Sequence, residues 1–324
     1  MVLSLSPRLL AWGRLLRVSL FATAAADPVV GAFLGSGGAP PGRALLAPLA
    51  SLCVYHGAMA LNDLADREED AANGRSRPLV EGLIGPGSAA AAVVLLLAAG
   101  LGLAFVAGGS SALAWLGVTA AVAVVYDLVG RGPWIGPSLL ALARGGNLLF
   151  GAVCAGWQPT TGSPLPWLAA TGYAAYVLVV SRLGRMEDGA AGQDLGRAPS
   201  RLLGILAGLL IGVPLATGLF AWVSAWLGPG LPTGLHLVAA LAGAFVGRRQ
   251  SRTAAMPLLV KRHQPDWTPA QVEGVMGLAL SRLLPLTVAC LLLATPTPAA
   301  LLAAAVLILA GRAGRSLMAT FPPS

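Results

Sequence analysis

Charged residues are scarce in this chain. Only 10% of its 324 residues are Asp, Glu, Lys or Arg, and the 13 acidic residues are outnumbered by 21 basic ones. Cysteine is scarce as well: Cys53, Cys154 and Cys290 stand alone in apolar segments, which excludes the paired spacings of disulfide frameworks and zinc sites. So little charge over this length also excludes a sizeable soluble domain.

Apolar residues fill the space that charge leaves. Hydrophobic residues make up 56% of the chain, and the mean hydropathy is +0.77. Runs of roughly 20 apolar residues are long enough to cross a bilayer, and at that length only helices satisfy their backbone in lipid. We therefore expect one all-α integral membrane domain over residues 1–324, a bundle of nine or ten spans. The expected spans are 18–35, 44–62, 88–108, 110–128, 135–157, 164–183, 201–227, 232–248, 274–294 and 298–312, of which the last is short and is either re-entrant or half of a hairpin.

Basic residues predict the orientation. With a cytoplasmic amino terminus, only Arg43 of the 21 Lys and Arg residues falls in an outer loop, while Arg144 and Arg282 fall within spans. This asymmetry obeys the positive-inside rule. The net charge of +8 is thus a topology signal that requires the lipid bilayer and no nucleic-acid partner. We expect a multi-pass protein of a cell membrane, such as a bacterial inner membrane.

Acidic residues gather at one place, where five carboxylates occur in the eight residues from Asp63 to Asp70. On a helix, Asp63, Asp66 and Asp70 fall within an arc of roughly 60°, whereas Glu68 and Glu69 lie off this face and are expected to be solvated. Two such charges about 4 Å apart repel by about 4 kcal/mol at an effective dielectric constant near 20. Oxygen ligands are those that Mg²⁺ prefers. The segment therefore predicts a magnesium site, with a merely acidic cytoplasmic loop as the alternative.

Four further polar residues stand inside apolar runs. Asp27 and Arg144 both lie about nine residues from the cytoplasmic ends of their spans, a depth of about 13 Å at 1.5 Å per residue. A lone charge there costs on the order of 3 kcal/mol or more, so we expect the two to pair directly or to share a polar pocket with Asn147. His56, on the helical face of the acidic segment, lines a cavity or is simply packed, and packing is the commoner role of a lone histidine.

The motif Asn62-Asp63-x-x-Asp66-x-x-x-Asp70, followed by Arg75-Ser-Arg77-Pro78-Leu79, resembles the first signature of the UbiA superfamily of intramembrane prenyltransferases. Asp27-Pro28 and the segment from Tyr126 to Arg131 fit the same resemblance. It implies a helical bundle around a central cavity, with Mg²⁺ as cofactor. It also implies transfer of a prenyl chain from a polyprenyl diphosphate to a lipophilic, often aromatic, acceptor.

The resemblance assigns roles to individual residues. The catalytic carboxylates that it implies are Asp63, Asp66, Asp70 and Asp188. The implied metal ligands are these four together with Asn62 and Glu187. Arginine makes bidentate contacts with phosphate oxygens, which supports basic residues as a diphosphate clamp. The implied diphosphate-binding residues are Asn62, Arg77, Tyr126, Arg131, Arg144, Asn147, Arg182 and Arg185. Arg131, Arg182 and Arg185 have topology anchoring as the alternative.

The second signature departs from the family pattern Asp-x-x-x-Asp-x-x-x-Gly. The matching segment here is Gly184-Arg-Met-Glu-Asp188-Gly-Ala-Ala-Gly192, in which the first aspartate is a glycine. Glu187 and Asp194 are nearby carboxylates that can compensate. The eroded motif and the Arg144-x-x-Asn147 pair also resemble the EboC-like branch of the superfamily.

Three functions therefore remain open. The first is a magnesium-dependent prenyltransferase. The second is a related protein that binds or moves a lipophilic precursor without prenyl transfer, which the glycine at position 184 favours. The third is an intramembrane terpene cyclase, in which a diphosphate ionises and no acceptor is used.

Overall fold

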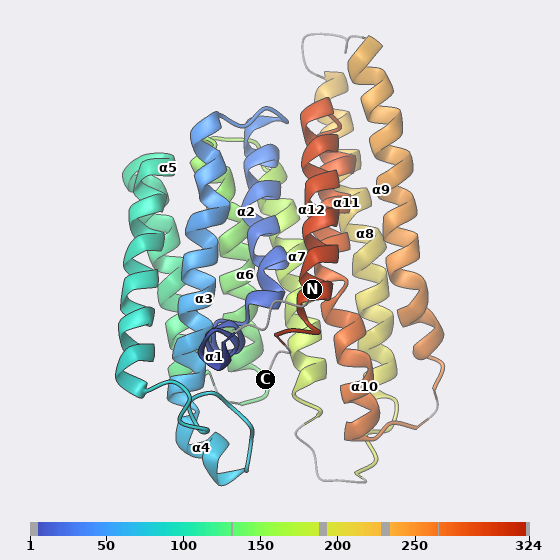
Figure 1. Ribbon diagram of the computed structural model, residues 1–324. Coiled ribbons are helices and arrows are strands. Elements are labelled where there is room, and N and C mark those ends of the chain that lie inside the picture. Colours follow the sequence, from blue (N-terminus) through green and yellow to red (C-terminus); the bar gives the residue numbers. More distant parts are fainter. Residues whose placement is uncertain (1–5, 131, 188–192, 228–233, 265, 322–324) are drawn as a thin grey trace.

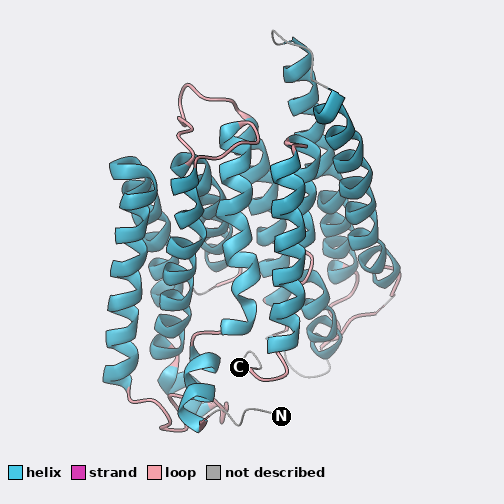
Figure 2. Cartoon of the chain, turned by 45° about the horizontal axis from the view of Figure 1, so that its top comes forward, coloured by secondary structure: helices cyan, strands magenta, loops and turns pink. Residues whose placement is uncertain are grey.

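The computed structural model describes residues 6–130, 132–187, 193–227, 234–264 and 266–321, and within them the regular secondary structure is helical (Figures 1 and 2). The α-helices are α1 (Pro7–Leu15), α2 (Phe21–Ser36), α3 (Ala47–Ala65), α4 (Arg67–Ala72), α5 (Pro86–Val129), α6 (Ile135–Cys154), α7 (Leu165–Gly184), α8 (Ala198–Leu227), α9 (Gly234–Lys261), α10 (Pro269–Leu280), α11 (Leu283–Ala294) and α12 (Pro298–Leu317). Two short 3₁₀ helices, η1 (Val18–Leu20) and η2 (Gly42–Leu46), precede α2 and α3.

In the described residues, seven helical segments are long and apolar enough to cross a membrane. They are Val18–Ser36, Gly42–Ala65, Pro86–Val129, Ile135–Cys154, Ala198–Trp226, Pro269–Ala294 and Pro298–Leu317. The last of these makes the expected run 298–312 a helix of 20 residues, longer than the sequence indicated. The protein is thus an all-helical, multi-pass membrane protein.

Helix α5 is a hairpin of two helices. Gly108 and Gly109 have non-helical backbone angles, and Gly109 has a φ of +71°, which glycine adopts without the strain of a side chain. A Cβ on Gly117 would lie 4.0 Å from the Leu101 side chain, although 16 residues of unbroken helix would separate the two by about 24 Å. The chain therefore reverses at the glycine pair. This confirms the two expected runs 88–108 and 110–128.

Two expected spans of the C-terminal half have different bounds in the structure. The run expected to end at residue 248 continues as α9 through Pro257 to Lys261. Ala255 and Leu258 are fully buried there, so packing maintains the helix past the proline. The expected span 274–294 lies within the candidate span Pro269–Ala294, which has a break between α10 and α11 around Ser281.

Helices α2 and α6 cross in close backbone contact. A Cβ on Gly31 would lie 1.8 Å from the carbonyl oxygen of Leu148, and one on Gly151 would lie 2.0 Å from that of Pro28. Only glycine fits at either position, as at other close helix crossings in membranes. This approach sets the neighbouring turns of the two helices, which carry the polar residues in the interior of the bundle.

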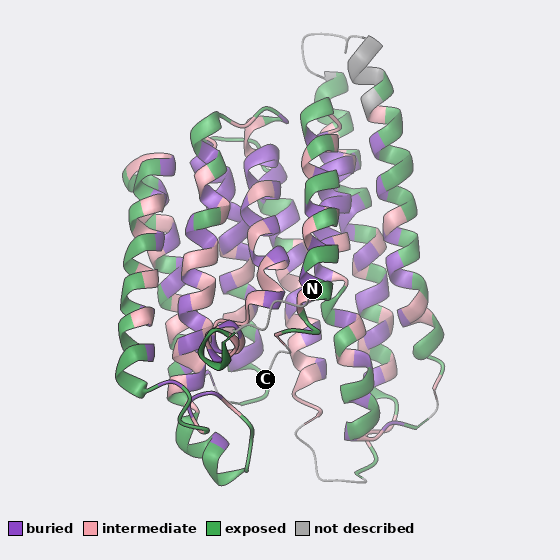
Figure 3. Cartoon of the chain, viewed as in Figure 1, coloured by how far each residue is buried: buried purple, intermediate pink, exposed green. Residues whose placement is uncertain are grey.

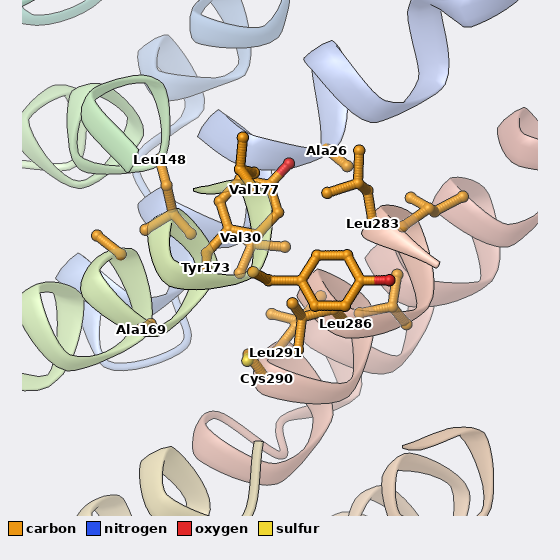
Figure 4. Close-up of a cluster of buried hydrophobic side chains, with 14 of the residues drawn as sticks. Ala26, Val30, Leu148, Ala169, Tyr173, Val177, Leu283, Leu286, Cys290 and Leu291 are labelled. Carbon is orange, nitrogen blue, oxygen red and sulfur yellow. The ribbon is translucent and has the colours of Figure 1, made fainter. Parts of the chain in front are cut away.

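The apolar core lies between the helices, where Figure 3 shows the buried residues, and many large apolar residues are exposed on the outside. Figure 4 shows part of the core, where side chains of α2, α6, α7 and α11 meet around Val30, Leu148, Tyr173 and Leu286. Large apolar residues such as Phe245, which is 68% exposed, form an outer surface that is suited to lipid rather than to water. Polar chemistry is therefore restricted to the interior and to the ends of the bundle.

Candidate active site at the acidic end of the bundle

The acidic segment lies at the end of the bundle where α4 is found, which is the lower end in Figure 1. The sequence predicted one continuous helix here, but the segment is broken. Helix α3 ends at Ala65, Asp66 has φ −90° and ψ 1°, and α4 begins at Arg67. The Asp70 N–H still donates to the Asp66 carbonyl at 2.8 Å, so the break is a local distortion. Asp63 and Asp70 still lie on one side of the segment, because both contact Arg77.

Asp63 is held between two arginines. Its side chain is almost fully buried, and its Oδ1 accepts hydrogen bonds from Arg17 Nη2 at 3.3 Å and Arg77 Nη1 at 3.5 Å. The second oxygen, Oδ2, is buried and has no hydrogen-bond partner among the described residues. A buried carboxylate oxygen without a donor is costly, so this oxygen is available to a cation or to a donor from a ligand.

Arg77 bridges the two ends of the acidic segment. Its Nε lies 3.5 Å from Asp70 Oδ2, and Asp70 is also paired with Arg75 at 3.2 Å. Burial lowers the pKa of the Arg77 guanidinium, and the charges of Asp63 and Asp70 oppose that shift. Arg77 thus lies next to the carboxylates, as the expected diphosphate clamp requires.

Arg17 was indicated by the sequence only as a basic residue at the membrane boundary. It follows α1, which lies across the bundle axis in Figure 1, and its φ of 49° turns the chain toward η1. Its guanidinium donates to Asn62 Oδ1 at 3.4 Å as well as to Asp63. Asn62 in turn donates to Asp66 Oδ2 at 3.1 Å. Proximity of η1 to the end of α3 is a tertiary feature, and no local pattern in the sequence predicts it.

The end of α5 adds a residue that was not among the expected site residues. Asp127 is 6% exposed, and its charge interacts with those of Arg17, Asp66 and Asp63. Tyr126, an expected residue, lies within electrostatic range of Arg185, Asp127 and Arg17. The sequence did give one signal for Asp127, because this residue is an aspartate at the expected cytoplasmic end of a span.

The arginines at the end of α7 contact the loop that precedes α6. Arg182 donates to the carbonyl of Pro133 and lies over the ring of Trp134, with 4.2 Å between the guanidinium carbon and the ring centroid. Arg185 donates to the carbonyl of Gly130 at 3.2 Å. These contacts fasten the two helix ends to each other.

Three other expected residues lie next to or inside gaps in the described chain. Glu187 is the last residue described before the gap, whereas Arg131 and Asp188 lie outside the described residues.

Gly184 has an apolar neighbour. A Cβ at this position would lie 3.1 Å from the Met276 Cε of α10, which packs on α7. The place where the family pattern has its first aspartate is therefore next to a thioether. A thioether is a soft ligand that does not suit magnesium.

A second ionic cluster lies in the interior of the bundle. Arg144 Nη2 pairs with Asp27 at 3.2 Å, and Arg144 also donates to the Tyr173 hydroxyl at 2.6 Å. Asn147 Nδ2 donates to Asp27 Oδ2 and to the Ala24 carbonyl, each at 3.2 Å. The expected pairing of Asp27 with Arg144 is confirmed, and Tyr173 is a partner that the sequence did not predict. Both oxygens of Asp27 are satisfied.

The face of α3 that leads inward from the acidic segment carries His56 and Tyr55. His56 Nδ1 lies 2.6 Å from the carbonyl oxygen of Leu16, so this histidine is hydrogen-bonded to the backbone near η1. The charges of Arg17 and Arg144 both act on Tyr55. Tyr55 thus lies within electrostatic range of the acidic end and of the interior cluster.

Magnesium fits the acidic end when a phosphate shares its coordination. Among the described residues no three His, Cys, Asp or Glu side chains converge closely enough to hold a metal ion by themselves. Magnesium at phosphate sites takes only one or two protein carboxylates and completes its shell with water and phosphate. The unpartnered Oδ2 atoms of Asp63 and Asp127 are hard ligands of this kind.

The family model described as "UbiA prenyltransferase family" matches residues 20–257, which is more than half of the chain. The chain belongs to the UbiA prenyltransferase family. The match includes the acidic end, the interior cluster and the eroded second motif.

Two archaeal members of the family match part of the chain. A digeranylgeranylglyceryl phosphate synthase of Methanopyrus kandleri is 33% identical over 168 residues, which is 52% of this chain and 59% of the relative. The synthase of the same name from Natronomonas pharaonis is 30% identical over 133 residues, or 39% of this chain and 46% of the relative. The chain thus matches about half the length of these curated relatives.

Solved structures show that the fold is UbiA-like. A digeranylgeranylglyceryl phosphate synthase structure has a TM-score of 0.56 at 20% identity and covers 87% of this chain and 98% of its own. A UbiA homologue from Archaeoglobus fulgidus bound to GPP and Mg²⁺ has a TM-score of 0.55 at 16% identity and covers 94% of this chain and 99% of its own. The same homologue bound to DMAPP and Mg²⁺ has a TM-score of 0.52.

An apolar groove of about 570 Å³ lies away from the carboxylates, between α6, α7 and the second half of α5. Trp115, Gly146 and Trp167 are among its lining residues. Val118, which also lines it, is 68% exposed, so the groove opens on the outer surface of the bundle. It is a lipid-facing feature, and the polar site is found elsewhere.

Proposed function

We propose that this protein transfers a prenyl chain from a prenyl diphosphate to a lipophilic acceptor, with Mg²⁺ as cofactor. The observation that carries the proposal is the buried Asp63, which faces Arg17 and Arg77 with one oxygen and has the other unpartnered. Such a site offers positive groups to a diphosphate and a hard ligand to its cation. A chain of the UbiA family needs both.

The residues of α3 and α4 are the proposed protein ligands of the cation. Asn62, Asp63, Asp66 and Asp70 supply oxygen atoms from one side, while Glu187 and Asp188 stay predictions for the other. When bound, magnesium neutralises charge that develops on the diphosphate as its bond to the allylic carbon breaks. Arg17 and Arg77 both contact Asp63. We expect rotation of their side chains to move each guanidinium from this carboxylate to a phosphate oxygen.

The remaining predicted diphosphate contacts divide into two groups. Tyr126, Arg131, Arg182 and Arg185 belong to the segments around the acidic end and stay in the proposal. Arg144 and Asn147 are engaged with Asp27 in the interior, which favours a role in packing or in orienting the acceptor over direct contact with the diphosphate.

We further propose that nine or ten spans enclose a central cavity whose mouth faces the cytoplasm. The hairpin in α5 supplies two spans from one helical segment, and α7 and α9 add two more helices to the bundle. The coupling of Tyr55 to both Arg17 and Arg144 supports a path from the mouth toward the interior. Fusing a reporter to each end of α3 tests the orientation.

The acceptor has two candidate classes. The family resemblance favours an aromatic compound, whereas the names of the curated relatives favour a prenylated glyceryl phosphate. The first test is to incubate purified protein with Mg²⁺, labelled geranylgeranyl diphosphate and either geranylgeranylglyceryl phosphate or 4-hydroxybenzoate. An adduct with one acceptor supports the proposal and selects the class, and diphosphate release with a hydrocarbon product identifies a terpene cyclase instead. No release with these acceptors or without one contradicts prenyl transfer.

Binding of a lipophilic precursor without transfer is a second candidate function. The contact between position 184 and Met276 favours it, because a thioether stands beside the place of a family carboxylate. The EboC-like branch belongs with this candidate. Gly184→Asp combined with Met276→Ala restores an aspartate and clears its neighbour. Gain of diphosphate release in this double variant from an inactive parent supports the second candidate, and an active parent excludes it.

A further inference from the structure

Asp127 is a buried carboxylate for which the first signature and the second signature give no role. It lies in the last turn of α5, is 6% exposed, and its Oδ2 is buried without a hydrogen-bond partner among the described residues. A carboxylate in such surroundings is stable only when a cation, a donor or a proton satisfies it. The side chain therefore needs a partner that a ligand can supply.

Among the described residues, the charges that act on Asp127 are those of two carboxylates, Asp66 and Asp63, and of Arg17. The guanidinium of Arg17 already donates to Asn62 and to Asp63 Oδ1. Asp63 is also paired with Arg77, so two described guanidinium groups face three carboxylates here. A divalent cation therefore improves the balance of charge more than a neutral donor would.

The opposite wall of the site lacks the carboxylate that the family pattern has there. Position 184 is glycine, and Met276 Cε is 3.1 Å from where its Cβ would be. Helices α5 and α7 both pack against α6, and Arg185 of the α7 end reaches Gly130, three residues after Asp127. The ends of α5 and α7 are thus adjacent, and α5 offers a carboxylate where position 184 of α7 has none.

We propose that Asp127 is a ligand of the divalent cation that accompanies the prenyl diphosphate, in place of the carboxylate missing at position 184. This proposal rests on the proposed function, because it needs a metal–diphosphate complex at the acidic end. The ligand atom is Oδ2, which is unpartnered, and Asp63 Oδ2 is the corresponding atom on α3. In this arrangement α3 and α5 would hold the divalent cation, and Glu187 and Asp188 after α7 stay predictions as further ligands.

The first test measures binding of Mn²⁺, by electron paramagnetic resonance, to purified protein with geranylgeranyl diphosphate present. We expect Asp127→Asn to weaken Mn²⁺ binding by about tenfold or more, as Asp63→Asn does. Glu68→Gln is the matched control, because it removes an exposed carboxylate from the same end of the bundle. The asparagine variant is isosteric, and its elution in size-exclusion chromatography checks that it is folded.

The outcomes separate the two proposals. Mn²⁺ binding that is lost in Asp63→Asn but stays within about twofold of wild type in Asp127→Asn overturns the role of Asp127 and leaves the proposed function standing. Failure of the wild-type protein to bind Mn²⁺ with the diphosphate overturns both. Equal losses in both variants, with Glu68→Gln unchanged, support both.

A second variant gives a readout by gain. Asp127→Cys places a soft ligand at the metal, so we expect Cd²⁺ affinity to rise about tenfold and a thiolate-to-metal absorption to appear. The wild-type protein is the control for the existing Cys53, Cys154 and Cys290. A cysteine variant that is folded and has unchanged Cd²⁺ affinity contradicts the proposal.

Discussion

Two ionic clusters of this protein contain the same chemical groups in different states of satisfaction. The interior cluster consists of Asp27, Arg144, Asn147 and Tyr173, and the mouth cluster consists of Asn62, Asp63, Asp70, Arg17 and Arg77. In the interior cluster both carboxylate oxygens of Asp27 have partners, at 3.2 and 3.3 Å. In the mouth cluster Asp63 has two arginines on one oxygen and none on the other.

The difference distinguishes a structural cluster from a ligand site. An ion pair deep in the bundle whose oxygens all have partners offers no atom to a ligand. Removal of one of its two residues leaves the other charge buried without a partner. An unsaturated cluster at the end of the bundle keeps oxygen atoms and guanidinium groups available. We expect substitutions in the interior cluster to change stability, and those in the mouth cluster to change binding and catalysis.

The largest expected effect is on stability. Arg144→Met leaves Asp27 buried without its cation, and we expect the free energy of unfolding in detergent micelles to fall by about 3–5 kcal/mol. Denaturant titration followed by circular dichroism measures this loss. The exchange of Asp27→Arg with Arg144→Asp sharpens the test: a double variant more stable than either single one supports direct pairing, and one as unstable as each contradicts it.

The next effect is on catalysis. Asp63→Asn removes a proposed metal ligand, and we expect kcat/KM for prenyl transfer to fall by about 10²–10³-fold, or about 3–4 kcal/mol in transition-state stabilisation. Its unfolding midpoint stays close to that of wild type because Arg77 keeps Asp70 as a partner. A variant that loses activity only in proportion to its folded fraction would make the mouth cluster structural, like the interior one.

A smaller effect is expected at Arg77. Arg77→Lys keeps the positive charge but cannot contact Asp63 and a phosphate through a planar fork. We expect KM for the prenyl diphosphate to rise about tenfold, or about 1.4 kcal/mol, with a smaller change in kcat. Steady-state kinetics at saturating Mg²⁺ measure the split. An unchanged KM contradicts a clamp at this residue.

The smallest effect is expected at Glu68. This residue belongs to the same acidic segment but is exposed on α4, as its place off the expected acidic face predicts. Glu68→Gln should change the free energy of unfolding by less than about 0.5 kcal/mol and leave turnover unaltered. Loss of turnover in this variant would mean that charge density of the whole segment, rather than the buried carboxylates, defines the site.

Much of the architecture was predictable because its signals are local. Lipid imposes a length and an apolar composition on each span, which is why 88–108 and 110–128 were separated at Gly108 and Gly109. The depth of Asp27 and Arg144 in their runs predicted a pair for the same reason, since a charge in an apolar run needs a partner. The acidic motif indicated the site because clustered carboxylates repel one another and need a cation to neutralise them.

Other features depended on contacts between distant segments. The break at Asp66, the extension of α9 past Pro257 and the break between α10 and α11 were not indicated by local patterns. Arg17 and Asp127 join the site from 45 residues before Asn62 and from the far end of α5, and neither belongs to the two aspartate-rich signatures. Met276 lies beside Gly184 because α10 packs on α7.

The sequence by itself determined that this chain is a helical membrane protein with a carboxylate-rich end, because hydrophobic length and charge patterning act on each segment separately. Only the tertiary structure decided which carboxylates are satisfied, because that depends on which arginines reach them from other helices. The unpartnered oxygens of Asp63 and Asp127 are such a result, and they distinguish the site for a ligand from the ion pair that holds the bundle together.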